Sequence, residues 1–449
     1  MPRLAVVLYA RGDITAAFVD KGDTFARTFL ATGTYGFIPG RPSAYTQPLY
    51  GFFLIPFYWI FGRHWEVVGS AHIVVAVATA WLVYEIGRRV ASERIGIVAA
   101  LLATLHPYLV WHDVHMNREV LDQLLAAAIV LLTLVAAERG SWWIAAALGG
   151  TLGVAILGNV RLVALPLVIA AYVLWRRGLA THGAVVALVV VASAVVVVAP
   201  WVVRNDITVG CAALTTDGRA LWKANNSNTL ATLRAGKWID DVPGIPGAPL
   251  TPQDAGDLYQ RTGRVVATNE CAQMHYYRRL AVDFVTDHPG EKAQLAVQAA
   301  GMLWQPSVTK TEGRPGKGTW LDLGRAWVEP AFMLLLYGFA IAGLFLVPRR
   351  FAVLALMLLA YDTAAAMLFA GETRYRAPWD FLTAVLAAAA LAALWNRRRR
   401  HAVEVGAVDD LGPIGAPSLD EELDGAPATR RAHAGGESGV PRERDQRLG

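Results

Sequence analysis

The stretch that organises the chain is DKGDTFARTFLATGTYGF, which runs from Asp20 to Phe37. Its apolar residues recur with helical spacing up to Gly33, and glycine is typical of the end of a helix. The pattern predicts a short amphipathic helix lying at a membrane surface. A carboxylate at its N-terminus, from Asp20 or Asp23, gains from the helix dipole. Such a carboxylate is either an N-cap or a catalytic group, and this stretch alone favours the cap.

The composition is that of a membrane protein. Of the 449 residues, 55% are hydrophobic and 17% are charged, and the mean hydropathy is +0.38. Soluble domains carry about 25% charged residues. The net charge of +5 is modest, and we expect no nucleic-acid partner. The chain is therefore predicted to cross the membrane several times and to carry some soluble mass.

Long apolar runs predict the membrane spans, because a span needs about 20 apolar residues. Residues 48–62 are interrupted by Pro56 and predict a juxtamembrane helix instead. Residues 1–10 are too short for a span, so we expect the first helix to begin before Met1 or to continue past Arg11. The predicted fold class is an all-α polytopic membrane protein with about ten transmembrane helices. The expected spans after the first are residues 67–86, 95–111, 121–137, 143–157, 162–175, 184–203, 330–347, 351–370 and 378–395.

Arginine clusters sort the loops by side, since positive residues gather in cytoplasmic loops. These clusters occur at residues 88–94, 176–177, 349–350 and 397–400. The opposite, extracytoplasmic side then receives residues 20–50, 112–119, 159–161, 204–328 and 372–376. We expect a multi-pass protein of the inner or plasma membrane with both termini in the cytoplasm.

This topology divides the chain into four segments. Residues 1–203 form an N-terminal transmembrane catalytic module whose first extracytoplasmic loop is 12–66. Residues 204–328 form an extracytoplasmic soluble segment, and residues 329–400 form the C-terminal transmembrane helices. Residues 401–449 lack hydrophobic periodicity and predict a disordered cytoplasmic tail.

The two cysteines, Cys211 and Cys271, both lie in the soluble segment. They pair if that segment faces an oxidising compartment, and otherwise they are two independent buried thiols. Their spacing does not decide between these alternatives. A helical stripe of aromatic and aliphatic residues in the same segment predicts packing rather than a sugar platform. The stripe consists of Tyr276, Tyr277, Leu280 and Phe284.

Polar residues gather where the helices reach the extracytoplasmic surface, at residues 112–119, 159–161 and 372–378. Ionisable groups at such depth are costly and are usually paired or functional. Arg374 and Arg376 suit a phosphate group because the guanidinium binds it bidentately and stays charged. The structural alternative is a salt bridge to Glu372 or Glu119.

With these residues in view, the chain resembles the GT-C-type membrane glycosyltransferases, and among them the protein O-mannosyltransferase and aminoarabinose-transferase branch. The likeness runs from Asp20 to about residue 394, and the order and common side of its motifs carry it. The motifs are Asp20 and Asp23 before Gly33-Thr34-Tyr35, the Pro48-Leu49-Tyr50 entry to an aromatic helix, Asn117-Arg118-Glu119, Gly158-Asn159-Val160-Arg161, residues 200–205 followed by Trp222 and Asn225, and Arg374-Tyr375-Arg376 before Pro378.

The resemblance implies an inverting glycosyltransferase that moves a sugar from a polyprenyl-phosphate donor to a glycan, lipid or protein acceptor at the extracytoplasmic face. A carboxylate of the first loop would be the general base. The family pattern often has an acidic pair or a tyrosine after this aspartate, where this chain has Phe25, so Asp20 and Asp23 both stay candidates. We favour Asp23, as the residue taken to precede the helix directly.

The resemblance assigns the other candidate residues as follows: Glu119 to the catalytic acidic group, Arg161, Arg374, Arg376 and Tyr375 to the donor phosphate, and His115, Trp222 and Asn225 to the acceptor or sugar. The sequence contains no nucleotide motif, and we expect no required cofactor. The spacing of His112 and His115, with Asp113 or Glu119, gives a weaker alternative of a divalent metal site.

Two other classes of function stay open at this point. A lipid or polysaccharide flippase or transporter would also be polytopic, although transporters often show repeats and broken helices at mid-membrane. A non-catalytic envelope-assembly protein would share the topology but gives no reason for outward-facing arginines. Neither the sugar nor the acceptor follows from the sequence.

Overall fold

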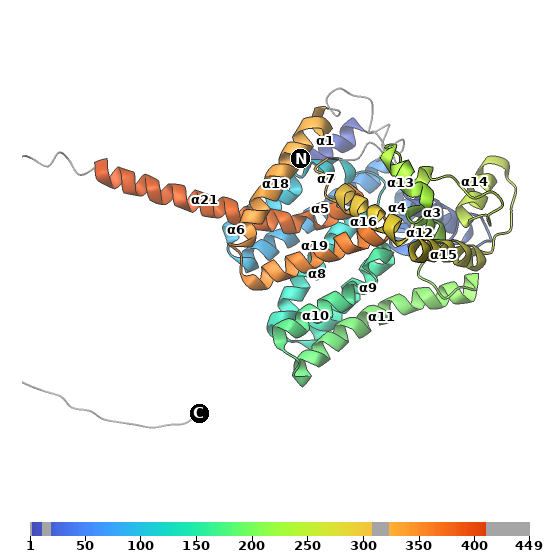
Figure 1. The fold of residues 1–449 in the computed structure, drawn as a ribbon, viewed down its shortest axis with the longest axis horizontal. Helices are drawn as coiled ribbons and strands as arrows, with labels where there is room; N and C mark the ends of the chain where they lie inside the picture. Colours follow the sequence, from blue (N-terminus) through green and yellow to red (C-terminus); the bar gives the residue numbers. More distant parts are fainter. Residues whose placement is uncertain (1, 11–18, 308–322, 410–449) are drawn as a thin grey trace, which may run out of the picture. The chain divides into compact units, whose positions relative to one another are not determined.

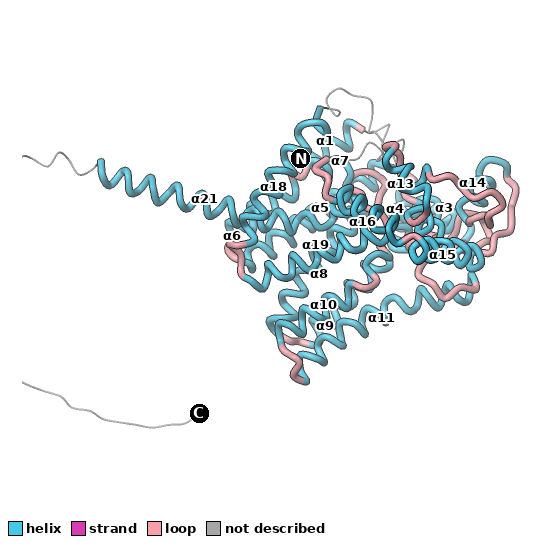
Figure 2. The backbone as a smooth tube through the Cα atoms, in the orientation of Figure 1, coloured by secondary structure: helices cyan, strands magenta, loops and turns pink. Residues whose placement is uncertain are grey.

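The computed structural model describes residues 2–10, 19–307 and 323–409 of the chain. In these residues the regular structure is helical, with no strand and two isolated bridges (Figures 1 and 2). The membrane-type helices are α1 (Pro2–Tyr9), α4 (Pro48–Phe61), α5 (Trp65–Val90), α6 (Glu93–Thr104), α7 (Pro107–His112), α8 (Glu119–Arg139), α9 (Trp142–Gly158), α10 (Leu165–Arg177), α11 (Thr181–Val209), α18 (Glu329–Leu344), α19 (Arg349–Leu368) and α21 (Asp380–Asp409). The others are α3 (Lys21–Thr32), η1 (Val160–Leu162), α12 (Gly218–Ala224), α13 (Ser227–Arg234), η2 (Ile239–Asp241), α14 (Pro252–Thr262), α15 (Glu270–Asp287), α16 (Pro289–Leu303), η3 (Gly324–Val328), α20 (Thr373–Arg376) and η4 (Ala377–Trp379).

Within the described residues, six helices are long and apolar enough to cross a membrane, so the protein is a multi-pass membrane protein. They are Trp65–Val90, Glu119–Arg139, Thr181–Val209, Ala326–Leu344, Arg349–Leu368 and Thr373–Arg397. Each overlaps a span expected from the sequence. Two further apolar helices, Pro48–Phe61 and Trp142–Gly158, are shorter. The expected total of about ten spans is therefore not confirmed.

One expected span, residues 95–111, is broken in two. The helix α6 ends at Thr104, and α7 begins at Pro107. Between them His106 has φ −57° and ψ 117°, outside the helical region. Proline disfavours a helical conformation in the residue before it and cannot donate a backbone hydrogen bond, so Pro107 ends one helix and starts the next.

Two of the basic turns expected on the cytoplasmic side, at residues 176–177 and 349–350, meet the turn after α8 at one end of the helices. Arg350, at the start of α19, forms a 3.0 Å ion pair with Glu138 at the end of α8. Arg177, at the end of α10, donates to the carbonyl of Ala137 at 3.1 Å. Tyr172 of α10 donates to the carbonyl of Arg350 at 2.9 Å. The sorting of these basic turns to a common side is thus present in the structure.

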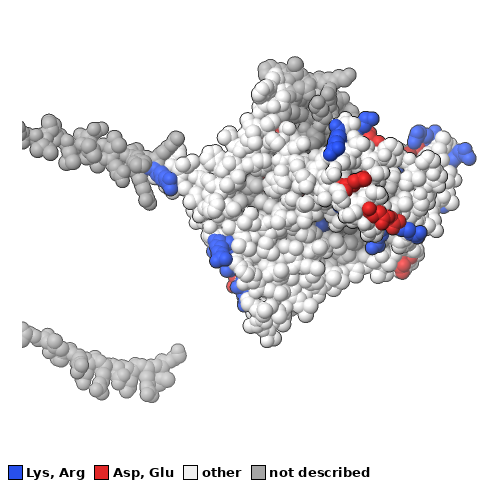
Figure 3. All heavy atoms as spheres, in the orientation of Figure 1, with Lys and Arg blue, Asp and Glu red and all other residues white. Residues whose placement is uncertain are grey.

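The polar elements gather at the other end of the long helices, where α3, α12, α14 and α15 lie close together (Figure 1). On the face drawn in Figure 3, charged side chains lie toward the two ends and leave a broad uncharged surface between them. The largest buried cluster of apolar side chains joins α5, α8, α9, α10, α11, α19 and α21. The protein therefore has an apolar helical body with a polar end.

Residues 1–397 form one compact unit, and residues 398–449 form a second. Of the second unit the structure describes only residues 398–409, which continue α21 to Asp409. The helix thus extends nine residues into the segment expected to be a tail, and disorder of that segment stays a prediction. Residues 410–449 lie outside the described residues.

Candidate active site at the polar end of the helices

Asp20 is the N-cap of α3 and is fixed on both sides. Its Oδ1 accepts a hydrogen bond from the backbone N–H of Gly22 at 2.7 Å, as aspartate commonly does before a helix. Its own backbone N–H donates to the carbonyl of Met116 at 2.8 Å. In the described part of the chain no hydrogen bond reaches Oδ2 of Asp20. The first loop therefore presents a positioned carboxylate beside the turn that precedes α8.

Asp23 does not directly precede the helix, so the reason for favouring it was wrong. The helix begins at Lys21, which places Asp23 in the first turn. Its buried carboxylate accepts from the hydroxyl of Tyr58 at 2.7 Å and from Nε and Nη2 of Arg63 at 2.9 and 2.6 Å. Both oxygens of Asp23 are thus engaged by neighbouring side chains, which is the arrangement of a structural ion pair.

The loop that follows α3 is held by residues of the soluble segment. Arg204 donates to the carbonyl of Ser43 at 3.0 Å, and Thr216 donates its backbone N–H to the carbonyl of Ala44 at 2.9 Å. The backbone N–H of Ala44 donates in turn to the Glu270 carboxylate at 3.0 Å. These contacts form a clamp that joins the first loop to two distant parts of the chain.

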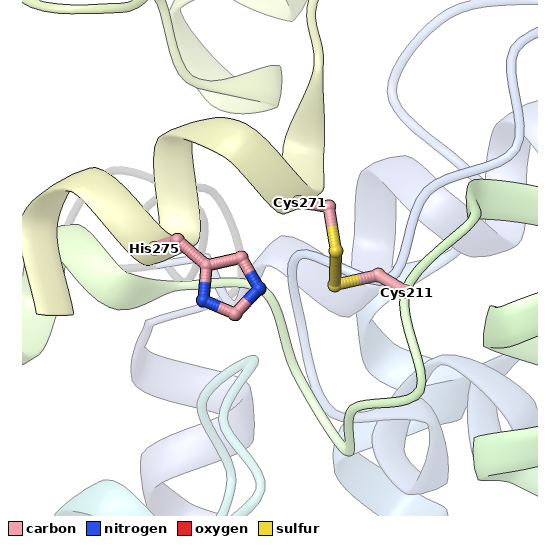
Figure 4. A group of neighbouring side chains, drawn as sticks. All are labelled: Cys211, Cys271 and His275. Carbon is pink, nitrogen blue, oxygen red and sulfur yellow. A yellow bond between two sulfur atoms is a disulfide. The ribbon is translucent and has the colours of Figure 1, made fainter.

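A disulfide closes this clamp. Cys211 and Cys271 form a disulfide, with Cα atoms 5.4 Å apart. Figure 4 shows this bond between the start of α15 and the loop after α11. The structure thus resolves the alternative left open by their spacing. Together with His275 they are the one group of three potential metal ligands found among the described residues. The histidine pair of residues 112–119 forms no such group there.

Lys21 ties the first turn of α3 to the soluble segment. Its Nζ lies 3.0 Å from Oδ2 of Asp217 and 4.7 Å from the centre of the Tyr45 ring. Burial alone would raise the pKa of Asp217, but the charge and hydrogen bond of Lys21 outweigh it and hold that pKa below its usual value. Because Lys21 directly follows Asp20, this ion pair also restricts the cap carboxylate.

The turn before α8 carries a second group of charged residues. Arg118 donates to Oε1 of Gln47 at 2.9 Å, and its Nε lies 3.8 Å from Oδ2 of Asp122. Asn159 donates to the same Asp122 oxygen at 3.2 Å. Burial disfavours the charged form of Arg118, but the carboxylates of Asp122, Asp20 and Glu119 outweigh it and raise its pKa. Arg118 is therefore held by Gln47 and Asp122, and the charge of the first-loop carboxylate acts on it.

Arg161 lies buried at the tip between α9 and α10. Its Cζ is 3.5 Å from the centre of the Tyr375 ring, and its Nη2 donates to the carbonyl of Ala370 at 2.5 Å. Tyr361 fixes its backbone by donating to the Arg161 carbonyl at 2.6 Å. Its Nη1 is buried and has no hydrogen-bond partner among the described residues. A buried donor of this kind is costly unless a ligand or water satisfies it.

Arg374 also contacts Tyr375, with its Cζ 4.8 Å from the centre of the ring. Its Nη2 donates to the hydroxyl of Tyr375 at 2.8 Å, and its Nε lies 2.7 Å from Oε2 of Glu372. The Glu372 residue is only 2% exposed. The salt bridge to Glu372 that the sequence offered as a structural alternative is therefore present, and Tyr375 contacts both Arg161 and Arg374.

Arg376 does not join this group. Its Nε donates to both carboxylate oxygens of Asp380 at 3.0 and 3.1 Å, and its Nη1 donates to the carbonyls of Leu303 and Gln305. His106 contacts the same Asp380 carboxylate at 3.1 Å. These contacts join Arg376 to α16 and α21, while its Nη2 is buried without a hydrogen-bond partner among the described residues. Its assignment to the donor phosphate therefore stays a prediction.

The residues expected to contact sugar or acceptor are engaged in packing. Trp222 is buried and lies 5.4 Å from the Tyr277 ring, centre to centre, so the stripe in α15 does pack as expected. Asn225 is 1% exposed and accepts from Nζ of Lys292 at 2.5 Å. His115 is buried, and its Nδ1 contacts the carbonyl of Trp111 at 2.6 Å.

Sequence reasoning missed Arg118 and Asp122 as site residues. Arg118 belongs to the Asn117-Arg118-Glu119 motif but was given no role. Asp122 lies three residues after Glu119 on α8, a spacing that puts both on one helix face. Oε2 of Glu119 and Oδ1 of Asp122 are buried without a hydrogen-bond partner among the described residues. The polar end of the helices thus combines buried acidic oxygens with a buried arginine donor, a set suited to binding a charged polar ligand.

Comparison with known proteins places this arrangement in a fold. Residues 42–203, about a third of the chain, match the family profile described as dolichyl-phosphate-mannose-protein mannosyltransferase. The archaeal oligosaccharyltransferase AglB from Archaeoglobus fulgidus, solved with an inhibitory peptide and a dolichol-phosphate, superposes with a TM-score of 0.50. The two sequences are 12% identical, and the match covers 94% of this chain and 52% of that one. No curated protein sequence matches the chain.

Two structures of ArnT from Cupriavidus metallidurans are more distant. The apo structure gives a TM-score of 0.39 at 15% identity, with 86% of this chain and 76% of that chain covered. The structure bound to undecaprenyl phosphate gives 0.36 at 16% identity, with 87% and 76% covered. The chain spans about half the length of AglB. The likeness to AglB confirms the GT-C-type fold that the sequence resemblance implied.

Proposed function

We propose that this protein is a membrane glycosyltransferase that moves a sugar from a polyprenyl-phosphate donor to an acceptor hydroxyl at the extracytoplasmic face. The observation that carries the proposal is the pair of arginines on Tyr375, one of which keeps a buried Nη1 without a partner among the described residues. The matched family profile, named for dolichyl-phosphate-mannose, and the dolichol-phosphate in the AglB structure support a lipid phosphate as the ligand.

The arginines would hold the donor phosphate. Arg161 packs on the Tyr375 ring and has an unpartnered Nη1 among the described residues. Arg374 donates to the hydroxyl of the same tyrosine. Guanidinium groups bind phosphate through parallel N–H bonds and keep their charge when buried. As the sugar leaves, negative charge grows on the phosphate, and fixed donors stabilise it most in a site that excludes water. Arg161 and Arg374 are thus placed to lower the barrier of bond breaking.

Asp20 is the better candidate for the general base. Asp23 is bound by Tyr58 and Arg63 through both oxygens, whereas the cap uses Oδ1 of Asp20. In an inverting step Asp20 would accept the proton of the acceptor hydroxyl while that oxygen attacks the anomeric carbon. The bond from this carbon to the phosphate oxygen breaks, and its electron pair stays on the phosphate. Glu119 and Asp122 would orient the reacting groups through Arg118.

Two features support an extracytoplasmic site. Disulfides persist in oxidising compartments, and Cys211–Cys271 lies at the end of the helices that carries the candidate site. The basic turns that meet through Arg350 and Glu138 lie at the opposite end, which the positive-inside rule assigns to the cytoplasm.

A transfer assay tests the proposal. The purified full chain in detergent is given a panel of radiolabelled polyprenyl-phosphate sugars together with an envelope extract. Asp20→Asn should abolish transfer while donor binding is retained, and Asp23→Asn, the matched control, should retain turnover in the folded fraction. Binding of donor lipid without transfer from any donor would favour a flippase instead. Absence of both binding and transfer would overturn the assignment of the arginines.

A further inference from the structure

Glu372 occupies a fixed place beside the arginines. It lies in the turn between α19 and α20, with extended backbone angles of −156° and 149°. The preceding residue, Gly371, packs so closely on the backbone of Ala299 that a Cβ atom there would overlap its carbonyl oxygen. The residue before that, Ala370, accepts the hydrogen bond from Arg161. The turn therefore has little freedom to move Glu372 away from its neighbours.

The buried carboxylate of Glu372 is neutralised mainly by its ion pair with Arg374. Arg374 lies 2.7 Å away, and the charges of Glu119, Arg161 and Asp240 also act on Glu372. A phosphate that takes both Arg374 and Arg161 as ligands would leave an ionised Glu372 buried, with the charge of Glu119 acting against it. Burying an unpaired charge costs several kcal/mol, and in practice the group takes up a proton instead.

The other elements packed on α20 bring three further charged groups. On α16, Lys292 donates to the carbonyls of Met367 and Leu368. On α19, the charge of Asp362 acts on Arg161. In the segment after α20, Asp380 is paired with Arg376. None of these three groups forms an ion pair with Glu372, so Arg374 and Arg161 are the cations of the described residues whose charges act on it.

We propose that Glu372 is the counter-ion that a lipid phosphate displaces from Arg374, and that it takes up a proton when the phosphate binds. The inference rests on the proposed function in one respect, which is that the ligand of Arg374 is the donor phosphate. The direction of the Glu372 pKa agrees: burial raises it, the Arg374 charge opposes the rise, and Glu119 adds to it. The Arg161 charge also opposes the rise, and a phosphate that neutralises both arginines removes these two opposing effects.

The exchange also bears on product release. The donor is a phosphodiester with one negative charge, whereas the lipid phosphate left after transfer is a monoester whose second ionisation lies near pH 6. The product therefore carries more charge than the donor near neutral pH. When Glu372 loses its proton and pairs with Arg374 again, it competes with this product for the arginine. Glu372 would thus favour exchange of product for new donor.

The test measures the pH dependence of binding with a probe of constant charge. Farnesyl methyl phosphate, a phosphodiester, keeps one negative charge between about pH 5 and 8, so any change in affinity comes from the protein. Binding to the full chain in detergent is followed by titration calorimetry, in two buffers of different ionisation enthalpy to count protons. For the parent protein we expect uptake of up to one proton and an affinity that falls by up to about tenfold per pH unit as pH rises.

Glu372→Gln should remove this pH dependence and the proton uptake while it keeps or raises affinity at neutral pH. Glu372→Asp keeps a carboxylate and should keep both effects. Asp240→Asn is the matched control, because the Asp240 side chain is 80% exposed and its charge also acts on Glu372; it should leave the pH dependence in place. A thermal melt of each variant identifies any that fail to fold.

The two proposals fail in different ways. If the parent binds the phosphodiester without proton uptake, or if Glu372→Gln keeps the full pH dependence, the counter-ion role is overturned and the transferase proposal stands. If Glu372→Gln does not fold, the proton count of the parent and of Glu372→Asp decides the question. If the parent binds neither this probe nor a longer polyprenyl phosphate, both proposals are overturned.

Discussion

The guanidinium of Arg161 lies over the ring of Tyr375, with its Cζ 3.5 Å from the centre of the ring. The contact joins the tip between α9 and α10 to the turn after α19, two segments more than 200 residues apart in the chain. A cation over an aromatic face is worth about 2 kcal/mol or more when both are desolvated. The contact with Tyr375 therefore holds the Arg161 guanidinium in place. Its Nη1, which has no hydrogen-bond partner among the described residues, stays available to a phosphate.

Arg161→Lys should raise the KM for the lipid donor by about 10- to 100-fold, because the lysine loses the planar stack and the second nitrogen. Tyr375→Phe keeps the ring and loses only the hydroxyl that accepts from Arg374, so its effect should be about tenfold or less. Donor titrations in the transfer assay measure both. Arg27→Lys, at an arginine whose side chain is 53% exposed, is the control. An equal effect of Arg27→Lys and Arg161→Lys would argue against the stack as a donor site.

Asp20→Asn and Asp23→Asn should separate catalysis from stability. Loss of a general base lowers kcat by about 100- to 10,000-fold, and we expect this for Asp20→Asn with a melting temperature near that of the parent. Asp23→Asn breaks the ion pair with Arg63, whose side chain is 37% exposed, and should cost about 1–2 kcal/mol of stability. Turnover and thermal melts of the two variants decide between them. The reverse pattern would restore Asp23 as the base.

Reduction of the Cys211–Cys271 bond should loosen the soluble segment and lower turnover without abolishing lipid binding. The cysteines are 60 residues apart, and chain-entropy estimates for such a loop give about 4 kcal/mol of stabilisation. Thermal unfolding with and without reductant measures the effect, and a Cys211→Ser, Cys271→Ser double variant should be unaffected by the reductant. Equal melting of the oxidised and reduced parent would show that the clamp holds without its disulfide.

Asp217→Asn should remove an acid-dependent part of the stability. The pKa of Asp217 is lowered in the folded protein, so its ion pair with Lys21 stabilises the fold above the unfolded pKa of about 3.9, and this contribution is lost as pH falls through the folded value. At neutral pH the variant should be less stable by roughly 1 kcal/mol, since Lys21 is partly exposed. The difference from the parent should shrink below about pH 4 in urea or thermal unfolding. A difference independent of pH would exclude this role for the carboxylate.

The sequence predicted the long helices well because apolar length is a local property. Each of the six long apolar helices of the described residues overlaps an expected span. The break at Pro107 was missed because the residues on both sides of this proline are apolar and were taken as one span. The restriction that proline places on the preceding residue is local and could have indicated the break. The limits of α3 were also missed, since Asp20 and Asp23 are both good caps by residue type. They are distinguished by partners that the sequence does not show, which are Met116 for Asp20 and Tyr58 and Arg63 for Asp23.

The candidate site was harder to predict because each side chain is assigned by partners far away in the sequence. Arg374 and Arg376 are two residues apart, but one faces Glu372 and the other Asp380 and the end of α16. No periodicity distinguishes them. Asn225 likewise gave a plausible polar contact for a sugar, and it is occupied by Lys292 from α16. Arg161 and Tyr375 could be named from the sequence because each belongs to a polar motif at the end of an apolar helix.

The clamp on the first loop has a consequence for how the protein is made. Ala44 is held by Glu270, which the ribosome adds 226 residues later, and at typical synthesis rates this delay is on the order of ten seconds or more. Until then Asp20 has its helix and its neighbour Met116, but the loop after α3 lacks its partners. The N-terminal helices can therefore enter the membrane well before the first loop is locked. With the soluble segment on the extracytoplasmic side, as we propose, activity should appear only once that segment has been translocated, folded and oxidised. Chains halted before α15 would then be inserted but inactive.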